Sequence, residues 1–150
     1  MQVVINKWLP SSTINPSSTV RDLGVILDAE LTMKPQIVRV TSTCFYQLRR
    51  LIHVRQSVGQ ELTTQLVHAF VLSRLDYGNS VLAGLPKSTT APLQRVQNAA
   101  ARLILGLRAR DHVTPALRQL HCLQVHQRIQ QQEALLMQRN RASTLSVQIV

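Results

Sequence analysis

The chain has few aromatic residues and few cysteines, and both shortages limit what it can be. Aromatic residues make up 3% of the 150 residues, so the core must be built from aliphatic side chains, a composition that suits helices. Cys44 and Cys122 lie far apart and form no CxxC pair, so we expect reduced, buried thiols. No apolar run approaches the ~20 residues of a membrane span, and polar residues interrupt the first ten positions, unlike a signal peptide. We therefore expect an intracellular protein, nuclear or cytoplasmic, without a membrane segment.

Acidic residues are also scarce. The sequence contains 7 Asp and Glu against 17 Lys and Arg, which gives a net charge of +10. The basic residues are nearly all arginine, whose planar guanidinium suits phosphates and base edges. This balance favours a polyanionic partner, with nucleic acid ahead of an anionic membrane surface. Composition drift in a GC-rich gene is the alternative explanation of the same excess.

The shortage of acids argues against catalysis. Two-metal phosphoryl transfer needs two carboxylates that converge on ions about 4 Å apart, and the chain has no Asp-Asp pair. Asp22 and Asp28 are a close acidic pair, but six residues of extended strand would separate them by roughly 20 Å. His121, Cys122 and His126 lie near one another without the paired, regularly spaced ligands of a structural zinc site. We expect no catalytic residue and no metal site.

Two segments near the N-terminus are rich in β-branched and aliphatic residues. They predict strands at residues 3–9 and 21–27, on either side of a loop rich in proline, serine and threonine. Gly24 within the second segment suggests a bulge or a close approach of backbones. An isolated pair of strands is marginal in water, so the pair resembles a piece of a larger sheet.

From residue 35 the apolar residues recur at helical spacing. Ser57 with Gln60 has the pattern of a capping box, and Gly106 weakens or ends a later helix. Three long and two shorter helices are predicted: 35–54, 57–77, 90–106, a short one from Thr114, and 125–138. Their spacing predicts a core that contains Leu48, Leu51, Leu62, Leu66, Phe70, Val96, Ala100 and Leu103.

The predicted fold class is therefore mainly α, a helical bundle preceded by a short two-stranded β fragment. We divide the chain into the β fragment at residues 1–34, the helical domain at 35–138 and a tail at 139–150.

The helix predicted at 90–106 has a polar face without acids. At 100° per residue its apolar residues form one stripe, and Arg95, Asn98 and Arg102 lie near the opposite side with Gln94 beside them. An ordinary solvated face usually mixes in Glu or Asp for i,i+4 pairs. An exposed row of this kind is able to follow a phosphate backbone or a minor groove.

The first predicted helix carries a similar face. Arg39, Tyr46 and Arg50 share it, and a tyrosine among arginines offers a surface on which a base or sugar can stack. An ordinary solvated face remains the alternative for this helix.

Five phrases of the sequence, taken in order, resemble the region that follows the polymerase palm in LINE-type (non-LTR) retrotransposon reverse transcriptases. They cover about residues 20–135 and read "VRDLGVILDAELTM", "VTSTCFYQLRRLIHVR", "HAFVLSRLDYGNSVLAGLP", "LQRVQNAAARLIL" and "VTPALRQLHCLQVHQRI". The chain departs from the family pattern at Gly78, where relatives tend to have cysteine. It also departs at Cys122 and Gln124, where they have tryptophan and proline.

The resemblance implies a truncated fragment of an RNA-directed DNA polymerase, with the palm edge first and a thumb-like domain after it. Arg95, Asn98 and Arg102 would then contact the backbone of a template–primer duplex, and Leu23 with Gly24 would lie near the primer end. We expect weak, sequence-independent binding of RNA–DNA or RNA duplexes and no polymerase activity by this chain alone. Mg²⁺ is implied only for an intact polymerase, so no cofactor is expected here. The alternative is a non-enzymatic helical protein-interaction domain derived from a mobile element.

Overall fold

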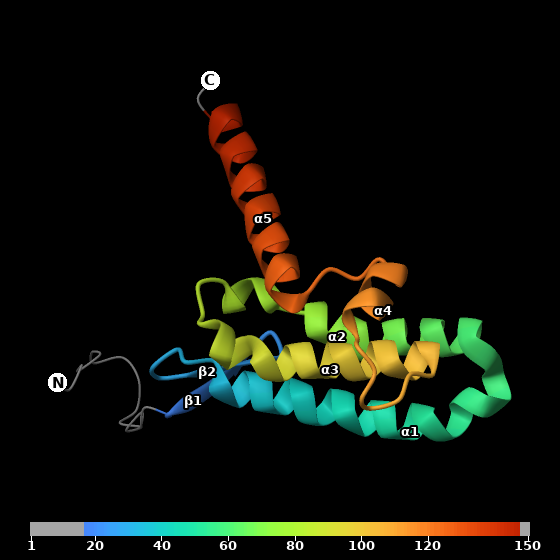
Figure 1. Cartoon of the computed structure of the whole chain (residues 1–150). Coiled ribbons are helices and arrows are strands. Elements are labelled where there is room, and N and C mark those ends of the chain that lie inside the picture. Colours follow the sequence, from blue (N-terminus) through green and yellow to red (C-terminus); the bar gives the residue numbers. More distant parts are fainter. Residues whose placement is uncertain (1–16, 148–150) are drawn as a thin grey trace.

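The computed structural model describes residues 17–147, with the side chains of residues 17–141. A short antiparallel hairpin precedes a set of helices (Figure 1), which confirms the mainly helical fold class with a small β fragment. The elements are β1 (Thr19–Asp22), β2 (Val25–Asp28), α1 (Lys34–Val67), the π-helix η1 (His68–Leu72), α2 (Ser73–Asp76), the 3-10 helix η2 (Asn79–Leu82), α3 (Lys87–Leu105), α4 (Thr114–Gln119) and α5 (Val125–Val147). The strand predicted at residues 3–9 lies outside the described residues.

The second predicted strand contains the turn of the hairpin. β1 pairs with β2 in antiparallel register, with Arg21 opposite Ile26. Leu23 and Gly24 connect the strands at φ values of 45° and 85°, the positive values that a two-residue hairpin turn of type I′ requires. The prediction of one strand over 21–27 is therefore wrong. Apolar residues on both sides of a two-residue turn look like one continuous strand.

This turn also shortens the distance between two acidic residues, Asp22 and Asp28, relative to an extended chain. Asp22 lies opposite Val25 next to the turn, and Asp28 lies at the other end of β2. Three residues of strand separate these positions by roughly 10 Å and place them on opposite faces. The expected separation of roughly 20 Å is wrong, because it assumed an extended chain. The two carboxylates still do not converge.

The hairpin is attached to the start of α1 by hydrogen bonds. Gln36 accepts one from the backbone N–H of Ile26 with its Oε1, at 2.9 Å. The Asp28 carboxylate accepts from the backbone N–H groups of Thr32 and Met33, at 3.0 and 2.9 Å. Since a two-stranded hairpin is marginal on its own, these bonds help to fix its position.

α1 folds back on itself at Gly59. This residue has φ 76° and ψ 178° within an otherwise helical stretch, a conformation that is essentially restricted to glycine. The chain reverses there, and the second half of α1 runs back beside the first (Figure 1). The predicted break before Ser57 is wrong, because the helix continues through Val58 until the glycine permits the reversal.

The returning half of α1, together with η1, buries a different stripe from the predicted one. Leu62 and Phe70 are 50% and 42% exposed, whereas Thr63, Val67 and Val71 are buried. Their prediction as core is wrong, because this segment is apolar nearly all round and spacing alone does not select the buried face. The π-helical turn of η1 shifts the face again by adding a residue to one turn. Among the other predicted core residues Leu66 is half-buried and the rest are buried: Leu48, Leu51, Val96, Ala100 and Leu103.

α3 packs along α1 and ends at Gly106. Leu93, Val96 and Ala100 of α3 are 0–2% exposed within the main core. Gly106 ends the helix with φ 70°, and the Arg55 guanidinium of α1 fills the space that a side chain would need there. A positive charge beside the last carbonyls of a helix is favourable, so Arg55 is placed to stabilise the end of α3.

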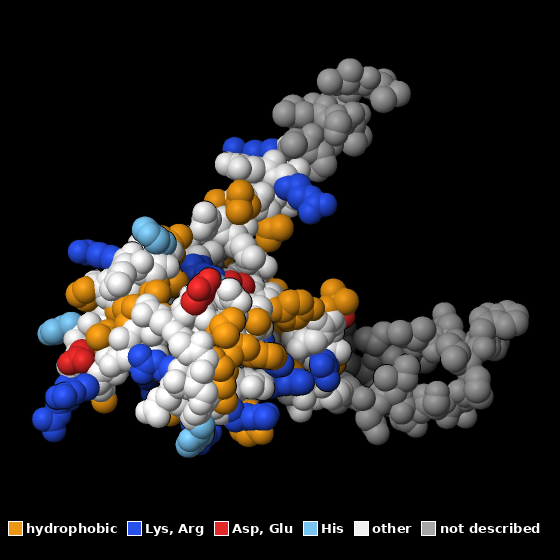
Figure 2. Space-filling view, turned by 90° about the vertical axis from the view of Figure 1, so that its right-hand side faces the viewer, with side chains coloured by type: hydrophobic (Ala, Val, Ile, Leu, Met, Phe, Trp, Pro, Cys, Tyr) orange, Lys and Arg blue, Asp and Glu red, His pale blue; other side chains and the backbone are white. Residues whose placement is uncertain are grey.

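α5 points away from the bundle (Figure 1). Its first two turns bury Val125 and Ile129, and no residue from 130 to 141 is buried. The helix continues to Val147, so much of the predicted tail at 139–150 is helical. Figure 2, which views the bundle from the Gly59 end, shows the open angle between α5 and the bundle.

Candidate nucleic-acid interface

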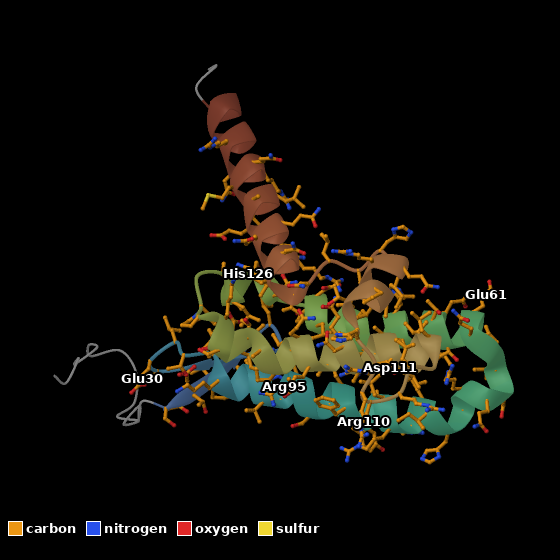
Figure 3. The ribbon with its side chains drawn as sticks, in the orientation of Figure 1. Glu30, Glu61, Arg95, Arg110, Asp111 and His126 are labelled. Atoms are coloured by element: carbon orange, nitrogen blue, oxygen red, sulfur yellow. The ribbon has the colours of Figure 1, made fainter. Side chains whose placement is uncertain are left out.

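The acidic residues lie outside long stretches of α1 and α3. Between Glu30 and Glu61, and again between Asp76 and Asp111, the sequence contains no Asp or Glu. Figure 3 labels Glu30 and Glu61 near opposite ends of the first half of α1, and Asp111 in the loop after α3. The basic residues on these acid-free stretches of the two helices are Lys34, Arg39, Arg49, Arg50, His53, Arg55, Lys87, Arg95 and Arg102.

Three neighbouring carboxylates are already engaged elsewhere. Hydrogen bonds, above all from the Thr32 hydroxyl, lower the pKa of Asp28. Asp111 accepts a backbone N–H of its own loop at 2.6 Å, and Asp76 pairs with Arg128. Among the described side chains none of the three pairs with an arginine of α1 or α3. The positive charges of these helices are therefore not neutralised by them.

Arg39, Tyr46 and Arg50 form an exposed stripe on α1, opposite the buried Ile37 and Cys44. Steps of seven and four residues keep all three on one helix face. The guanidinium carbon of Arg50 lies 5.8 Å from the centroid of the Tyr46 ring, within the range of a cation–π contact. This stripe, which we call the α1 stripe, is open to solvent.

The polar face of α3 is divided between the surface and the fold. Arg95 is exposed on α3 (Figure 3). Gln94 instead donates a hydrogen bond to Oδ1 of Asn98 at 2.9 Å. Its Oε1 accepts the backbone N–H of Val125, the first residue of α5, also at 2.9 Å. These two amides therefore help to seat α5.

Arg102 is half-buried and donates to the backbone carbonyl of Asp111 at 3.3 Å. The expectation of one exposed row is therefore wrong, since Gln94, Asn98 and Arg102 are all partly covered and only Arg95 is exposed. The physical reason is the chain after α3, which returns across this face before α5 begins. Helical spacing places residues on one face but does not say whether another segment covers it.

Gln97 of α3 has a structural role that the helical spacing did not predict. This side chain is 1% exposed. Its Nε2 donates to the Leu123 carbonyl at 2.7 Å, and its Oε1 accepts from Gln94 at 2.9 Å. Its burial could have been predicted from its position, because a glutamine four residues after Leu93 lies on the apolar stripe of the helix. A polar side chain buried there needs hydrogen-bond partners.

Leu23 and Gly24, placed near a primer end by the family resemblance, form the tip of the hairpin. The Tyr77 hydroxyl donates to the Leu23 carbonyl at 2.5 Å, and the Tyr77 ring lies 3.6 Å from the position of a Cβ on Gly24. A Cβ on Gly78 would lie 3.0 Å from Val25. The phrases "LGVILD" and "LDYGN" therefore contact each other in the folded chain.

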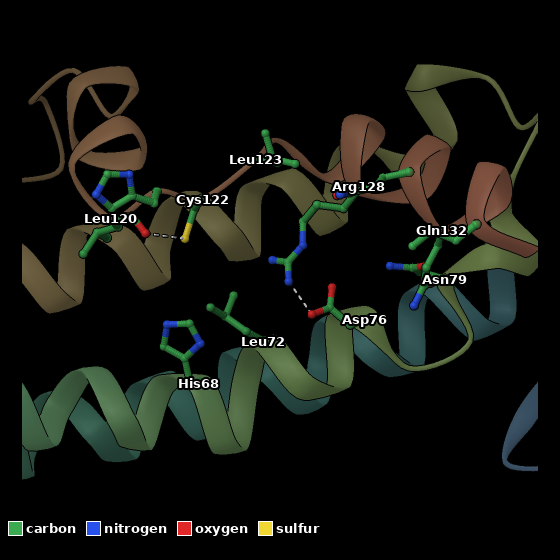
Figure 4. Close-up of a pocket in the computed structure, with 12 residues that line it drawn as sticks. His68, Leu72, Asp76, Asn79, Leu120, Cys122, Leu123, Arg128 and Gln132 are labelled. Carbon is green, nitrogen blue, oxygen red and sulfur yellow. Dashed lines mark hydrogen bonds and ion pairs between the residues drawn. The ribbon is translucent and has the colours of Figure 1, made fainter.

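A cleft of about 440 Å³ lies between η1 and α2 on one side and, on the other, α5 with the segment before it (Figure 4). The half-buried pair of Asp76 and Arg128 lies in it, together with His68 and Cys122. Burial raises the pKa of both Asp76 and the Cys122 thiol, so Cys122 is a weak nucleophile near neutral pH. Within residues 17–141 no three His, Cys, Asp or Glu side chains are grouped so that they could hold a metal ion.

No helix in the described part of the chain is long and apolar enough to cross a membrane. No protein-family model, curated protein sequence or solved structure matches this chain. The resemblance to LINE-type reverse transcriptases therefore stays a prediction that rests on the quoted phrases.

Proposed function

We propose that this chain is a thumb-like fragment of a retrotransposon reverse transcriptase that binds the backbone of an RNA–DNA or RNA duplex without extending a primer. The observation that supports this function best is the set of exposed arginines on the acid-free stretches of α1 and α3. Arg39, Arg50 and Arg95 are exposed, and no described carboxylate pairs with them. Binding through such a surface releases counterions from the nucleic acid and does not depend on base sequence.

The spacing of the α1 stripe suits a nucleic-acid backbone. Arg39 and Arg50 are eleven residues apart, ~16 Å along the helix axis, a span that reaches several phosphates of one strand. Arginine side chains are long and donate several hydrogen bonds, so small mismatches in register are tolerated. These contacts position a duplex but carry no sequence information.

Primer extension is not part of the proposal. The reaction needs carboxylates that converge on two metal ions. Asp22 and Asp28 lie on opposite faces of the hairpin, and Asp28 is bound to the turn before α1. In the proposed parent polymerase the Mg²⁺ site would be formed by residues of the palm.

Anisotropy titration of a labelled RNA–DNA duplex at several salt concentrations tests this function. We expect weak binding that is equal for unrelated sequences, with log affinity falling linearly as log salt rises. Arg95→Ala should weaken binding to every sequence and reduce the salt slope by about one unit. Arg102→Ala should have a smaller effect, because its guanidinium is already bound to the Asp111 carbonyl.

Arg118→Ala is the matched control, since it removes an exposed arginine from α4. Its effect on affinity should be clearly smaller than that of Arg95→Ala. Equal losses in the two variants would contradict a site on α3 and leave only a general effect of net charge. Absence of duplex binding at low salt would reject the proposed function and favour the protein-interaction domain.

A further inference from the structure

The two tyrosines of the chain have similar exposure but different surroundings. Tyr46 is 54% and Tyr77 is 60% exposed. Tyr77 serves the fold, because its hydroxyl bonds the Leu23 carbonyl and its ring covers Gly24. Tyr46 has no hydrogen-bond partner within residues 17–141, and the contact recorded for its ring is with Arg50 of the same helix. Within residues 17–141 no hydrogen bond therefore requires a tyrosine at this position.

The neighbours of Tyr46 leave its ring available. Arg50 follows it by one helical turn and lies over the ring at 5.8 Å, and the tyrosine side chain is still 54% exposed. Thr43, which precedes Tyr46 by nearly one turn, bonds its hydroxyl to the Arg39 carbonyl at 2.9 Å. Its side chain is thereby held to the helix backbone and does not bond the tyrosine hydroxyl.

The charges around the ring fit a nucleotide. Arg39 lies seven residues before Tyr46, ~10.5 Å along the axis, and Arg50 lies ~6 Å beyond it. An aromatic ring between two cations can stack on a base while the cations contact the phosphates on either side. Stacking of this kind tolerates any base, because every base has a π face.

We propose that Tyr46 is a stacking site for an unpaired base, with Arg39 and Arg50 as the flanking phosphate contacts. The chain would then bind single-stranded RNA or DNA in addition to a duplex backbone, since a base inside a duplex does not present its face to a helix side chain. This inference rests on the proposed function, because it uses the same acid-free stretch of α1.

The test compares a labelled single strand with an abasic strand of the same length, which has the same phosphates and no bases. The strand with bases should bind at least about fivefold more tightly, the lower limit for stacking one base on an aromatic side chain. Tyr46→Ala should abolish this difference without changing the salt slope, because it removes no charge. Tyr46→Trp should retain the difference, because tryptophan also stacks.

Tyr77→Phe is the matched control. It loses the hydroxyl that bonds Leu23 but should keep the full preference for the strand with bases. Equal binding of the two strands by the unaltered protein, or an unchanged preference in Tyr46→Ala, would overturn the stacking site while duplex binding remains intact. Failure to bind either the single strands or the duplex at low salt would overturn the proposed function as well.

Discussion

The polar faces of α1 and α3 look alike in sequence and differ in the folded protein. Both carry arginines at helical spacing, and neither residues 34–60 of α1 nor α3 contain Asp or Glu. On α1 the stripe of Arg39, Tyr46 and Arg50 is exposed. On α3 Gln94, Asn98 and Arg102 lie partly beneath the chain that leads to α5. One face is available to a ligand, and much of the other holds the fold together.

The chemistry of the side chains explains this difference. The covered face of α3 is rich in amides, and an amide both donates and accepts hydrogen bonds. Gln97 donates to the Leu123 carbonyl, and Gln94 accepts from the backbone N–H of Val125. Both backbone groups lie outside regular hydrogen-bond ladders and need partners. Guanidinium groups only donate, so a stripe of arginines is poorly suited to this role. Amides on a helix face can therefore indicate an internal contact, and arginines a surface left for an external one.

The largest expected effect is on the free energy of unfolding, when a buried leucine is replaced in the helical segment that follows the reversal at Gly59. Leu75 is 5% exposed and Leu62 is 50% exposed. Leu75→Ala should lower the free energy of unfolding by ~2–5 kcal/mol, because it removes packed methyl groups and leaves a cavity. Leu62→Ala should cost less than about 1 kcal/mol. Urea unfolding of the two variants measures both values, and equal losses would contradict the buried stripe described here.

A smaller effect is expected from the amide network of α3. Gln97→Ala removes the donor to the Leu123 carbonyl and the acceptor for Gln94. Leaving buried polar groups without partners costs about 1–3 kcal/mol, and the loss should appear in urea unfolding. Loosened contact of α5 should also speed hydrogen exchange at the backbone N–H of Val125.

Gln56→Ala is the control for this substitution, since Gln56 is an exposed glutamine of α1. It should change the free energy of unfolding by no more than about 0.5 kcal/mol. If Gln97→Ala changed the free energy of unfolding as little as Gln56→Ala, the amide network of α3 would not stabilise the fold. The proposed difference between the face of α3 and the α1 stripe would then be wrong.

The sequence was sufficient for the helical bundle and for the face of α1. Ile37, Cys44 and Leu48 recur at helical spacing and are buried as expected, because one apolar stripe with polar residues opposite it leaves a single way to pack. The segment around Leu62 and Phe70 has no such contrast, so its buried face depends on the reversal at Gly59 and on the π-helical turn.

The candidate interface was predictable only in part for a related reason. Arg95 and the α1 stripe follow from local spacing. Arg102 is partly buried because a later segment of the chain crosses α3. This is a long-range contact, which local spacing does not predict. Gly24 shows the same limit on a smaller scale, since a turn of two residues has almost no sequence length in which to be recognised.

The smallest expected effect concerns Cys44, which is fully buried. Its Sγ lies 3.8 Å from the Val71 carbonyl. Burial raises the pKa of this thiol from 9.0 to about 11, with Arg74 opposing the shift. A raised pKa means that the folded state holds the proton more tightly than the unfolded chain. The stabilisation is therefore complete below about pH 9 and is lost as the pH rises toward 11.

Urea unfolding between about pH 7 and 10 should show this loss as about 1.4 kcal/mol beyond the loss in Cys44→Ala. The comparison with Cys44→Ala is needed because other groups titrate in the same range, among them Cys122, whose pKa burial also raises. Parallel pH profiles for the unaltered protein and Cys44→Ala would show that the thiol is not held protonated by the core. If the free energy of unfolding falls less steeply with pH in Cys44→Ala than in the unaltered protein, the core holds the Cys44 thiol protonated. Cys44 then stabilises the fold, whereas Tyr46 lies on the open face of the same helix.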